Sequence, residues 1–200
     1  MLTDIDGDNG HSSGGGSGRG HHTPSDVLDF WFAPGNEARW FRSDPAFDAE
    51  ISSRYAALVE AAKASRLHDW TATPDGSLAL CLLLDQFPRN IWRGTPQAYS
   101  CDERARQIAN DAIACGHDRA VPVGRRLFFY LPFEHSEDLA DQERCLVLMR
   151  GLIDREQLHW AERHHAVIAR FGRFPHRNQI LGRESSPEEI EFLGQPGSSF

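Results

Sequence analysis

The chain has 200 residues and a mass of 22.5 kDa, which is the size of one ordinary domain or of a domain with a tail. With 40% hydrophobic residues, 25% charged residues and a net charge of −8, it has a globular composition and lacks the basic excess of proteins that bind nucleic acid non-specifically. No apolar run approaches the roughly 20 residues of a membrane span, and no secretory signal pattern opens the chain. These features exclude membrane, collagenous, disulfide-scaffold and fully disordered proteins.

Residues 1–22 differ in composition from the rest of the chain. They contain seven of the 17 glycines and no aromatic residue. Such a segment buries too little apolar surface to offset the entropy lost on ordering. We therefore predict a disordered Gly/Ser-rich tail over 1–22 and a single all-helical domain over 23–200.

From residue 23 onward the punctuation is typical of helices. A Ser or Thr precedes Pro at four places, which pairs an N-cap oxygen with a residue suited to the first helical position: Pro24, Pro74, Pro96 and Pro187. Three glycines suit a left-handed residue after a helix: Gly116, Gly172 and Gly194. No β-branched alternation indicates a strand. We predict about eight helices, over 24–32, 46–64, 75–87, 96–115, 122–131, 136–153, 155–171 and 187–193, in an all-α fold of antiparallel helix pairs.

The four cysteines, Cys81, Cys101, Cys115 and Cys145, lie in predicted helices and form no CxxC pair. This pattern is typical of buried thiols in a reducing compartment, so we expect a cytoplasmic protein. The sequence contains no phosphate-binding loop, dinucleotide fingerprint, zincin motif or serine-hydrolase elbow. It therefore predicts no cofactor and no metal site.

The predicted helix 75–87 is apolar on every side over residues 78–84, so it should be buried. Asp85 follows this apolar run, and a buried carboxylate is costly unless it is paired. Arg89 and Arg93 are close in sequence, and Gln86 and Asn90 supply amides. Asp85 either forms a structural ion pair that fixes the helix end, or it is a buried brace that orients an arginine into a pocket.

A second polar run precedes the predicted helix 136–153, for which Ser136 is the expected N-cap. At about 100° per residue, Asp138, Gln142, Cys145 and Met149 share one stripe. Polar groups at the buried start of a helix indicate either a pocket wall or an interhelical hydrogen-bond network.

The predicted helix 155–171 places its apolar side chains on one face together with His164: Trp160, Val167, Ile168 and Phe171. His159, Glu162 and His165 fall outside that face, so the di-metal-like Glu-x-x-His spacings should point to solvent. His164 is either a satisfied core residue or part of the same cavity as Asp138.

The segment 170–178 contains three arginines and one histidine around a rigid proline turn. Clustered arginine indicates an anion clamp, for which Arg173, His176, Arg177 and Asn178 are candidates. The alternative is a basic loop that neutralises an acidic chain.

Several stretches of the sequence resemble a known protein family. The stretches 27–32, 84–90 with Arg93 and Gly94, 135–144, and His164 with 170–178 are similar to the bacterial family called domain of unknown function 924. The resemblance spans about residues 25–200. It implies an all-α, tetratricopeptide-like (TPR-like) stack of antiparallel helical hairpins, and it supplies no reaction. Glu134 before His135 departs from the uncharged residue expected there.

The first functional hypothesis is a cytosolic helical-repeat protein that binds a small anionic ligand or an acidic peptide. Its predicted ligand-binding residues are Asp85, Gln86, Arg89, Asn90, Arg93, Asp138, Gln142, His164, Arg173, His176, Arg177 and Asn178. The second is an enzyme that uses the same pocket, with His164 or His135 as general acid or base and Asp138 as its partner. The third is a purely structural polar network. No nucleic acid or membrane partner is expected, and the oligomeric state stays open.

Overall fold

The computed structural model describes residues 22–152 and 154–198, so the predicted tail over 1–22 lies outside the described residues except for its last position. The described part is helical and contains no strand, which confirms the all-α class. The TPR-like stacking stays a prediction. The α-helices are α1 Pro24–Trp31, α2 Pro45–Lys63, α3 Pro74–Cys81, α4 Phe87–Ile91, α5 Asp102–Ala114, α6 His117–Ala120, α7 Val123–Glu134, α8 Leu139–Arg150, α9 Arg155–Phe171 and α10 Pro187–Leu193.

Short 3₁₀ turns connect several of these helices: η1 Glu37–Arg39, η2 His68–Ala72, η4 Pro96–Tyr99 and η5 Pro175–Arg177. Sequence patterns did not predict η1, η2, η5 or the single-turn helix α6, and the predicted helix 96–115 is divided into η4 and α5. Each is too short to show a hydrophobic period, which is the signal on which helix prediction depends.

The expected capping chemistry is present at three of the four Ser/Thr-Pro sites. Thr23 and Ser186 form capping boxes with Asp26 and Glu189, and the Thr73 side chain accepts from the Gly76 N–H. At the fourth site the side chain of Thr95 makes no cap; its hydroxyl donates to the Trp92 carbonyl.

Two of the three predicted helix-ending glycines adopt the left-handed conformation. Gly116 has φ of 76° and Gly172 has φ of 67°. The prediction was wrong for Gly194, which has φ of −74° because it continues the right-handed turn after α10.

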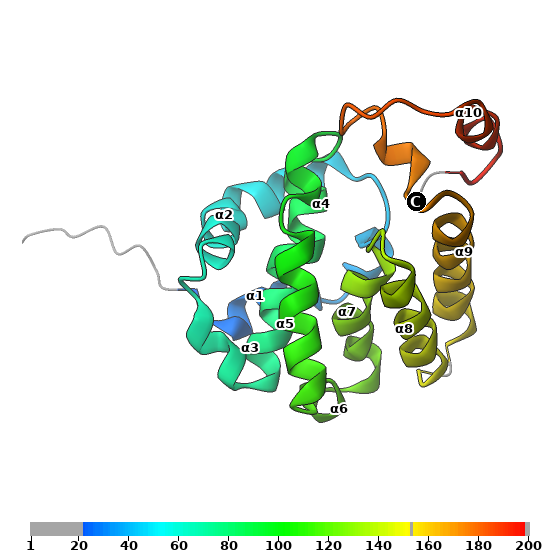
Figure 1. Ribbon diagram of the computed structural model, residues 1–200. Coiled ribbons are helices and arrows are strands. Elements are labelled where there is room, and N and C mark those ends of the chain that lie inside the picture. The colour runs from blue at the N-terminus through cyan, green and yellow to red at the C-terminus, as the bar shows by residue number, and fades with distance from the viewer. Residues whose placement is uncertain (1–21, 153, 199–200) are drawn as a thin grey trace, which may run out of the picture.

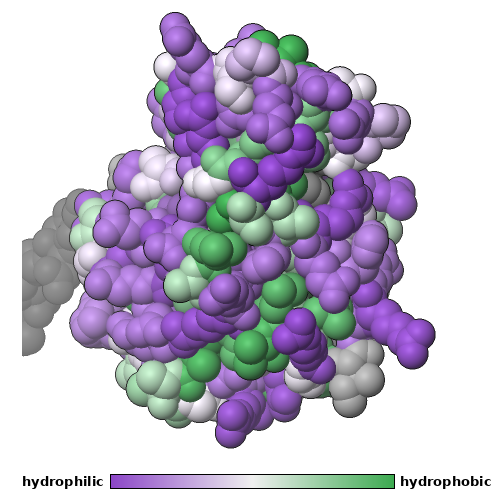
Figure 2. All heavy atoms as spheres, turned by 45° about the vertical axis from the view of Figure 1, so that its right-hand side comes forward, coloured by the Kyte–Doolittle hydropathy of each residue, from purple (hydrophilic) through white to green (hydrophobic). Residues whose placement is uncertain are grey.

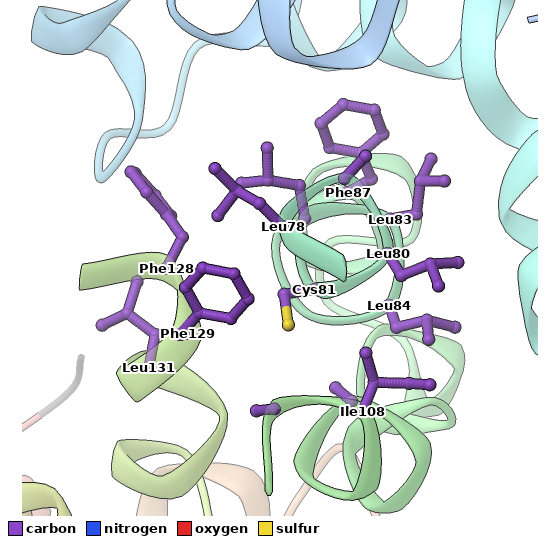
Figure 3. Packing of buried hydrophobic residues seen from close by; sticks show 14 of the residues in the cluster. Leu78, Leu80, Cys81, Leu83, Leu84, Phe87, Ile108, Phe128, Phe129 and Leu131 are labelled. Atoms are coloured by element: carbon purple, nitrogen blue, oxygen red, sulfur yellow. The ribbon is translucent and has the colours of Figure 1, made fainter. Parts of the chain in front are cut away.

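Helix α3, at the lower left of Figure 1, is buried from Gly76 to Cys81 and contacts α1, α5 and α7. Its apolar side chains radiate in several directions: Leu78 lies on the side of Phe128, whereas Leu84 lies on the side of Ile108 (Figure 3). Every residue from 76 to 88 is buried, as the all-round apolar pattern predicted.

The chain continues from α3 through one π-helical turn, η3 Leu82–Gln86, directly into α4. Such a turn adds a residue to the helical repeat and often occurs at functional sites. Here it contains Asp85 and Gln86, which are the first polar side chains after the buried apolar run.

Helices α7, α8 and α9 pack in succession, and the short turns between them lie at opposite ends, so neighbours run antiparallel (Figure 1). The C-terminal segment with α10 lies at the top of that view. Figure 2 shows a lobe at the top of the molecule above a broader body, with patches of apolar residues among polar ones. No helix in the described part of the chain is long and apolar enough to span a membrane.

All four cysteines are free thiols, and Cys81, Cys101 and Cys145 are buried as predicted. The prediction was wrong for Cys115, which is exposed because it caps the solvent-facing C-terminus of α5.

Candidate functional site

Five segments that are far apart in the sequence bring polar and aromatic side chains together around the π-helical turn. They are the π turn with α4, the η4–α5 junction, the end of α7, the middle of α9, and η5. We call the assembled side chains the buried polar cluster: Asp85, Arg89, Tyr99, Asp102, Glu134, His135, His164, Phe174, His176 and Arg177.

Asp85 is the anchor of the cluster and is 1% exposed. Its Oδ1 lies 2.7 Å from His135 Nδ1 and 3.3 Å from Arg89 Nη1, and its Oδ2 accepts from Gln86 Nε2 at 2.6 Å. Burial opposes ionisation, but the ring of His135 and the guanidinium of Arg89 outweigh it, so the pKa of Asp85 lies below its usual range. Asp85 is therefore a carboxylate at neutral pH.

The guanidinium of Arg89 makes three hydrogen bonds within the fold. It donates to both carboxylate oxygens of Asp102, at 2.9 and 3.0 Å, and to the backbone carbonyl of Asp85 at 2.7 Å. Burial alone would lower the pKa of Arg89, but the charges of Asp85 and Asp102 raise it above its usual value. Arg89 is a brace that joins α4 to the start of α5.

Arg177 has a very different environment, although it is 6% exposed. Its guanidinium carbon lies 4.6 Å from the centroid of the Tyr99 ring and 4.4 Å from that of Phe174. Its nearest carboxylate oxygen, Oδ2 of Asp102, is 3.6 Å away, which is beyond hydrogen-bond distance. Among the described residues its guanidinium has no hydrogen-bond acceptor, and its Nε is fully buried.

An arginine in this state is costly, because buried donors are ordinarily satisfied and buried charges paired. Burial and the like charge of Arg89 lower the pKa of Arg177 to about 10, so it still carries its charge at neutral pH.

His135 caps the C-terminus of α7, with its backbone N–H on the Leu131 carbonyl. The carboxylate of Asp85 can only accept, so the proton of the His135 ring lies on Nδ1 and Nε2 carries the lone pair. Burial and the charge of Arg89 lower the pKa of His135, so the ring is neutral at neutral pH. In the described part of the molecule Nε2 has no hydrogen-bond partner, and the side chain is 15% exposed.

Glu134 and His164 form the second carboxyl–imidazole contact. Oε1 of Glu134 lies 3.3 Å from His164 Nδ1, which also donates to the Trp160 carbonyl at 2.9 Å. Burial and the charge of Asp85 raise the pKa of Glu134 to about 8, whereas burial lowers the pKa of His164 to about 3. Both groups are therefore neutral at pH 7, and Oε2 of Glu134 is buried without a partner among the described residues.

Gln142 is fully buried and secures the turn that carries Glu134 and His135. Its Nε2 lies within hydrogen-bond distance of three backbone carbonyls, at 3.3, 2.6 and 2.7 Å from those of Phe133, Glu134 and Ser136. The Gln142 amide thus positions the α7–α8 turn, while its Oε1 is buried without a hydrogen-bond partner among the described residues.

The expectation for the start of α8 needs correction. Asp138, and not Ser136, is the N-cap: its Oδ1 accepts from the N–H groups of Ala140 and Asp141. Asp138 is exposed and makes no contact with either histidine proposed as its partner. The helix begins three residues later than predicted, and this moves Asp138 out of the helical stripe that suggested a pocket wall.

Four other predicted ligand-binding residues lie outside the cluster, in pairs of their own. Arg93 and Asn90 both donate to Asp48, Arg173 binds Glu189 through two hydrogen bonds, and Asn178 contacts Ser185 and Arg183. The structure brings together the remaining candidates Asp85, Gln86, Arg89, His135, His164, His176 and Arg177.

Sequence reasoning missed Tyr99, Asp102 and Phe174 and noticed Glu134 only as a departure. Asp102 has an ordinary position for an acid in the first turn of a helix, which concealed its long-range pairs. On α9, His164, Val167 and Ile168 are buried as predicted, while Trp160 is exposed. The described residues contain no group of three or more His, Cys, Asp or Glu suited to a metal ion.

Comparisons with known proteins give a family and a fold. The family model described as "Bacterial protein of unknown function (DUF924)" matches residues 27–197. The solved structure of a protein of unknown function from Agrobacterium tumefaciens is similar with a TM-score of 0.82 and 47% identity, over 86% of this chain and 96% of that one. A search of curated proteins found no match.

Proposed function

This chain belongs to the DUF924 family of bacterial proteins, and we propose that it binds a small anionic ligand through the guanidinium of Arg177. The observation that carries the proposal is a charged side chain, 6% exposed, whose guanidinium has no hydrogen-bond acceptor among the described residues. A buried donor without an acceptor costs about 1–3 kcal/mol, and more when it is charged. An anion that accepts from this guanidinium would recover that free energy.

Four other arginines supply a contrast that supports this proposal. Arg89, Arg93, Arg173 and Arg183 each donate two hydrogen bonds to one carboxylate, on Asp102, Asp48, Glu189 and Glu137 respectively. The donors of these four arginines are therefore taken up by carboxylates of the same chain. Arg177 departs from the pattern and is the candidate for external binding.

The test measures thermal unfolding of the full chain with acetate, benzoate, sulfate and inorganic phosphate. An anion at 100 times its dissociation constant adds about 2.7 kcal/mol, which raises the melting temperature of a domain this size by about 5–10 °C. The rise should disappear in Arg177→Gln and persist in the control Arg93→Gln. The proposal would be contradicted if none of the four anions raised the melting temperature, or if the rise were undiminished in Arg177→Gln.

A second candidate function, general-base catalysis at the same site, is favoured by the Asp85–His135 pair. A carboxylate that holds Nδ1–H and leaves Nε2 with an open lone pair is the arrangement of a catalytic base. Its partner is Asp85 and not the Asp138 expected from sequence. Hydrolysis of 4-nitrophenyl acetate tests it: the rate above background should fall in His135→Gln, and equal rates would count against a base at this position.

A further inference from the structure

The charge of the buried polar cluster limits what can bind to Arg177. Two carboxylates, Asp85 and Asp102, stand against two guanidiniums, Arg89 and Arg177. Burial leaves Glu134 protonated with a pKa of about 8, and burial lowers the pKa of His164 to about 3 and that of His176 to about 4. The cluster is therefore close to neutral at pH 7 before any ligand arrives.

A neutral cluster accepts one negative charge more readily than two. A phosphate monoester carries between −1.5 and −2 charges at pH 7, roughly twice that of a carboxylate. Its second charge would find no further cation here, because Arg89 already donates to Asp102 and to the Asp85 carbonyl. It would also lie near Asp102, whose Oδ2 is 3.6 Å from Nη1 of Arg177.

The aromatic rings restrict the geometry of the ligand. Tyr99 and Phe174 both lie against the Arg177 guanidinium, with centroids 4.6 and 4.4 Å from its central carbon. The N–H groups of a guanidinium lie in its plane, and a carboxylate can accept two of them side by side. A flat apolar group attached to that carboxylate would lie against the half-buried ring of Tyr99, because Phe174 is fully buried and serves only to hold the guanidinium.

The same loop already shows how it holds a carboxylate. Glu137 accepts from Arg183 through both oxygens, at 2.6 and 2.9 Å, and from the backbone N–H of Phe174 at 2.8 Å. That backbone donor is the one just before η5, next to Arg177 in the fold. Because Glu137 occupies it, it is not available to the additional oxygens of a phosphate.

Resting on the proposed function, we infer that the ligand of Arg177 is a monocarboxylate with a flat apolar body, and not a phosphorylated compound. The inference stands on the guanidinium held against Tyr99 and Phe174, on the nearby donors that already have acceptors, and on the two carboxylates that balance the two guanidiniums of the cluster. It names a ligand class that the family assignment does not provide.

The experiment is isothermal titration of the full chain at pH 7 with three probes: benzoate, cyclohexanecarboxylate and inorganic phosphate. Benzoate should bind at least tenfold more tightly than phosphate, and more tightly than cyclohexanecarboxylate, whose ring is not flat. Arg177→Gln should abolish benzoate binding. Arg177→Lys, which keeps the charge and loses the planar fork, should weaken it at least tenfold and provides a second variant if the first does not fold.

The outcomes separate this inference from the proposed function. Phosphate binding equal to or tighter than benzoate binding, lost in the Arg177 variants, would leave the proposed function standing and overturn the carboxylate inference. No binding of any probe would overturn both. Benzoate binding that survives in both Arg177 variants would place the site elsewhere and also overturn both.

Discussion

Nδ1 of His135 lies 2.7 Å from Oδ1 of Asp85, although 50 positions of sequence separate the two residues. This contact joins the end of α7 to the π-helical turn after α3, and Arg89 extends it to Asp102 at the start of α5. Three helical segments of the fold are thereby tied together through one buried carboxylate.

Replacing Asp85 should therefore lower the free energy of unfolding substantially. Asp85→Asn leaves Arg89 and His135 without their shared carboxylate, and breaking a buried ion pair on one side costs about 3–5 kcal/mol. Because Arg89 keeps Asp102, we expect the lower end of that range in urea unfolding. The control is Glu188→Gln, which breaks the exposed Arg170–Glu188 pair and should cost no more than about 1 kcal/mol. Equal losses in the two variants would refute the anchoring role of Asp85.

Glu134 should make stability depend on pH. Its folded-state pKa of about 8 lies above the ordinary value of 4.5, so its contribution is fully present below pH 4.5 and is lost as the pH rises through 8. Glu134→Gln keeps the neutral shape and removes the titration. Between pH 5 and pH 9 the variant should gain at least about 1.4 kcal/mol relative to wild type, the value of one pKa unit. A difference that stays constant with pH would contradict a protonated Glu134.

His164 and His176 should make the free energy of unfolding depend on pH in the acid range. Burial lowers the folded-state pKa of His164 to about 3 and of His176 to about 4, below the ordinary value of 6.5. Their contribution is present above pH 6.5 and is lost as the pH falls toward 4. His176→Gln should therefore lose less stability than wild type on acidification from pH 7 to pH 4.5, as measured by the urea midpoint. Parallel acid profiles for the two proteins would be evidence against a buried neutral His176.

Gln142 gives a test of the α7–α8 turn. Gln142→Met keeps the volume but leaves the carbonyls of Glu134 and Ser136 without the amide that now bonds them. Each unsatisfied buried acceptor costs about 1–3 kcal/mol, so the loss of both bonds should lower the melting temperature by roughly 4–24 °C. An unchanged melting temperature would show that the turn does not need this amide.

Much of the fold was predictable because local signals agree with it. The Ser/Thr-Pro starts at residues 23–24, 73–74 and 186–187 were correct, and so was the all-round burial of residues 78–84. These are short-range effects of capping and periodicity, which a sequence displays directly.

The candidate site was only partly predictable, for a different physical reason. Arg93 and Arg177 look equivalent in the sequence, yet Arg93 meets Asp48 from 45 positions away and Arg177 meets two aromatic rings. Which partner an arginine finds is decided by tertiary packing. The prediction that Asp138 lies on the inner face of a helix was wrong for a local reason. The helix begins at residue 139 and not at residue 136, so Asp138 is its N-cap.

The central claim is that Arg177 serves a ligand and not the stability of the fold, and paired substitutions test it most directly. A buried charge without hydrogen bonds destabilises a fold, so its replacement by an apolar side chain should be neutral or stabilising. Breaking a satisfied buried pair instead costs about 3–5 kcal/mol. The measurement is the free energy of urea unfolding of Arg177→Met and Arg89→Met without added anions. The account predicts that Arg177→Met stays within about 1 kcal/mol of wild type or above it, while Arg89→Met loses about 3 kcal/mol or more. A loss in Arg177→Met as large as that in Arg89→Met would show that Arg177 is a structural brace.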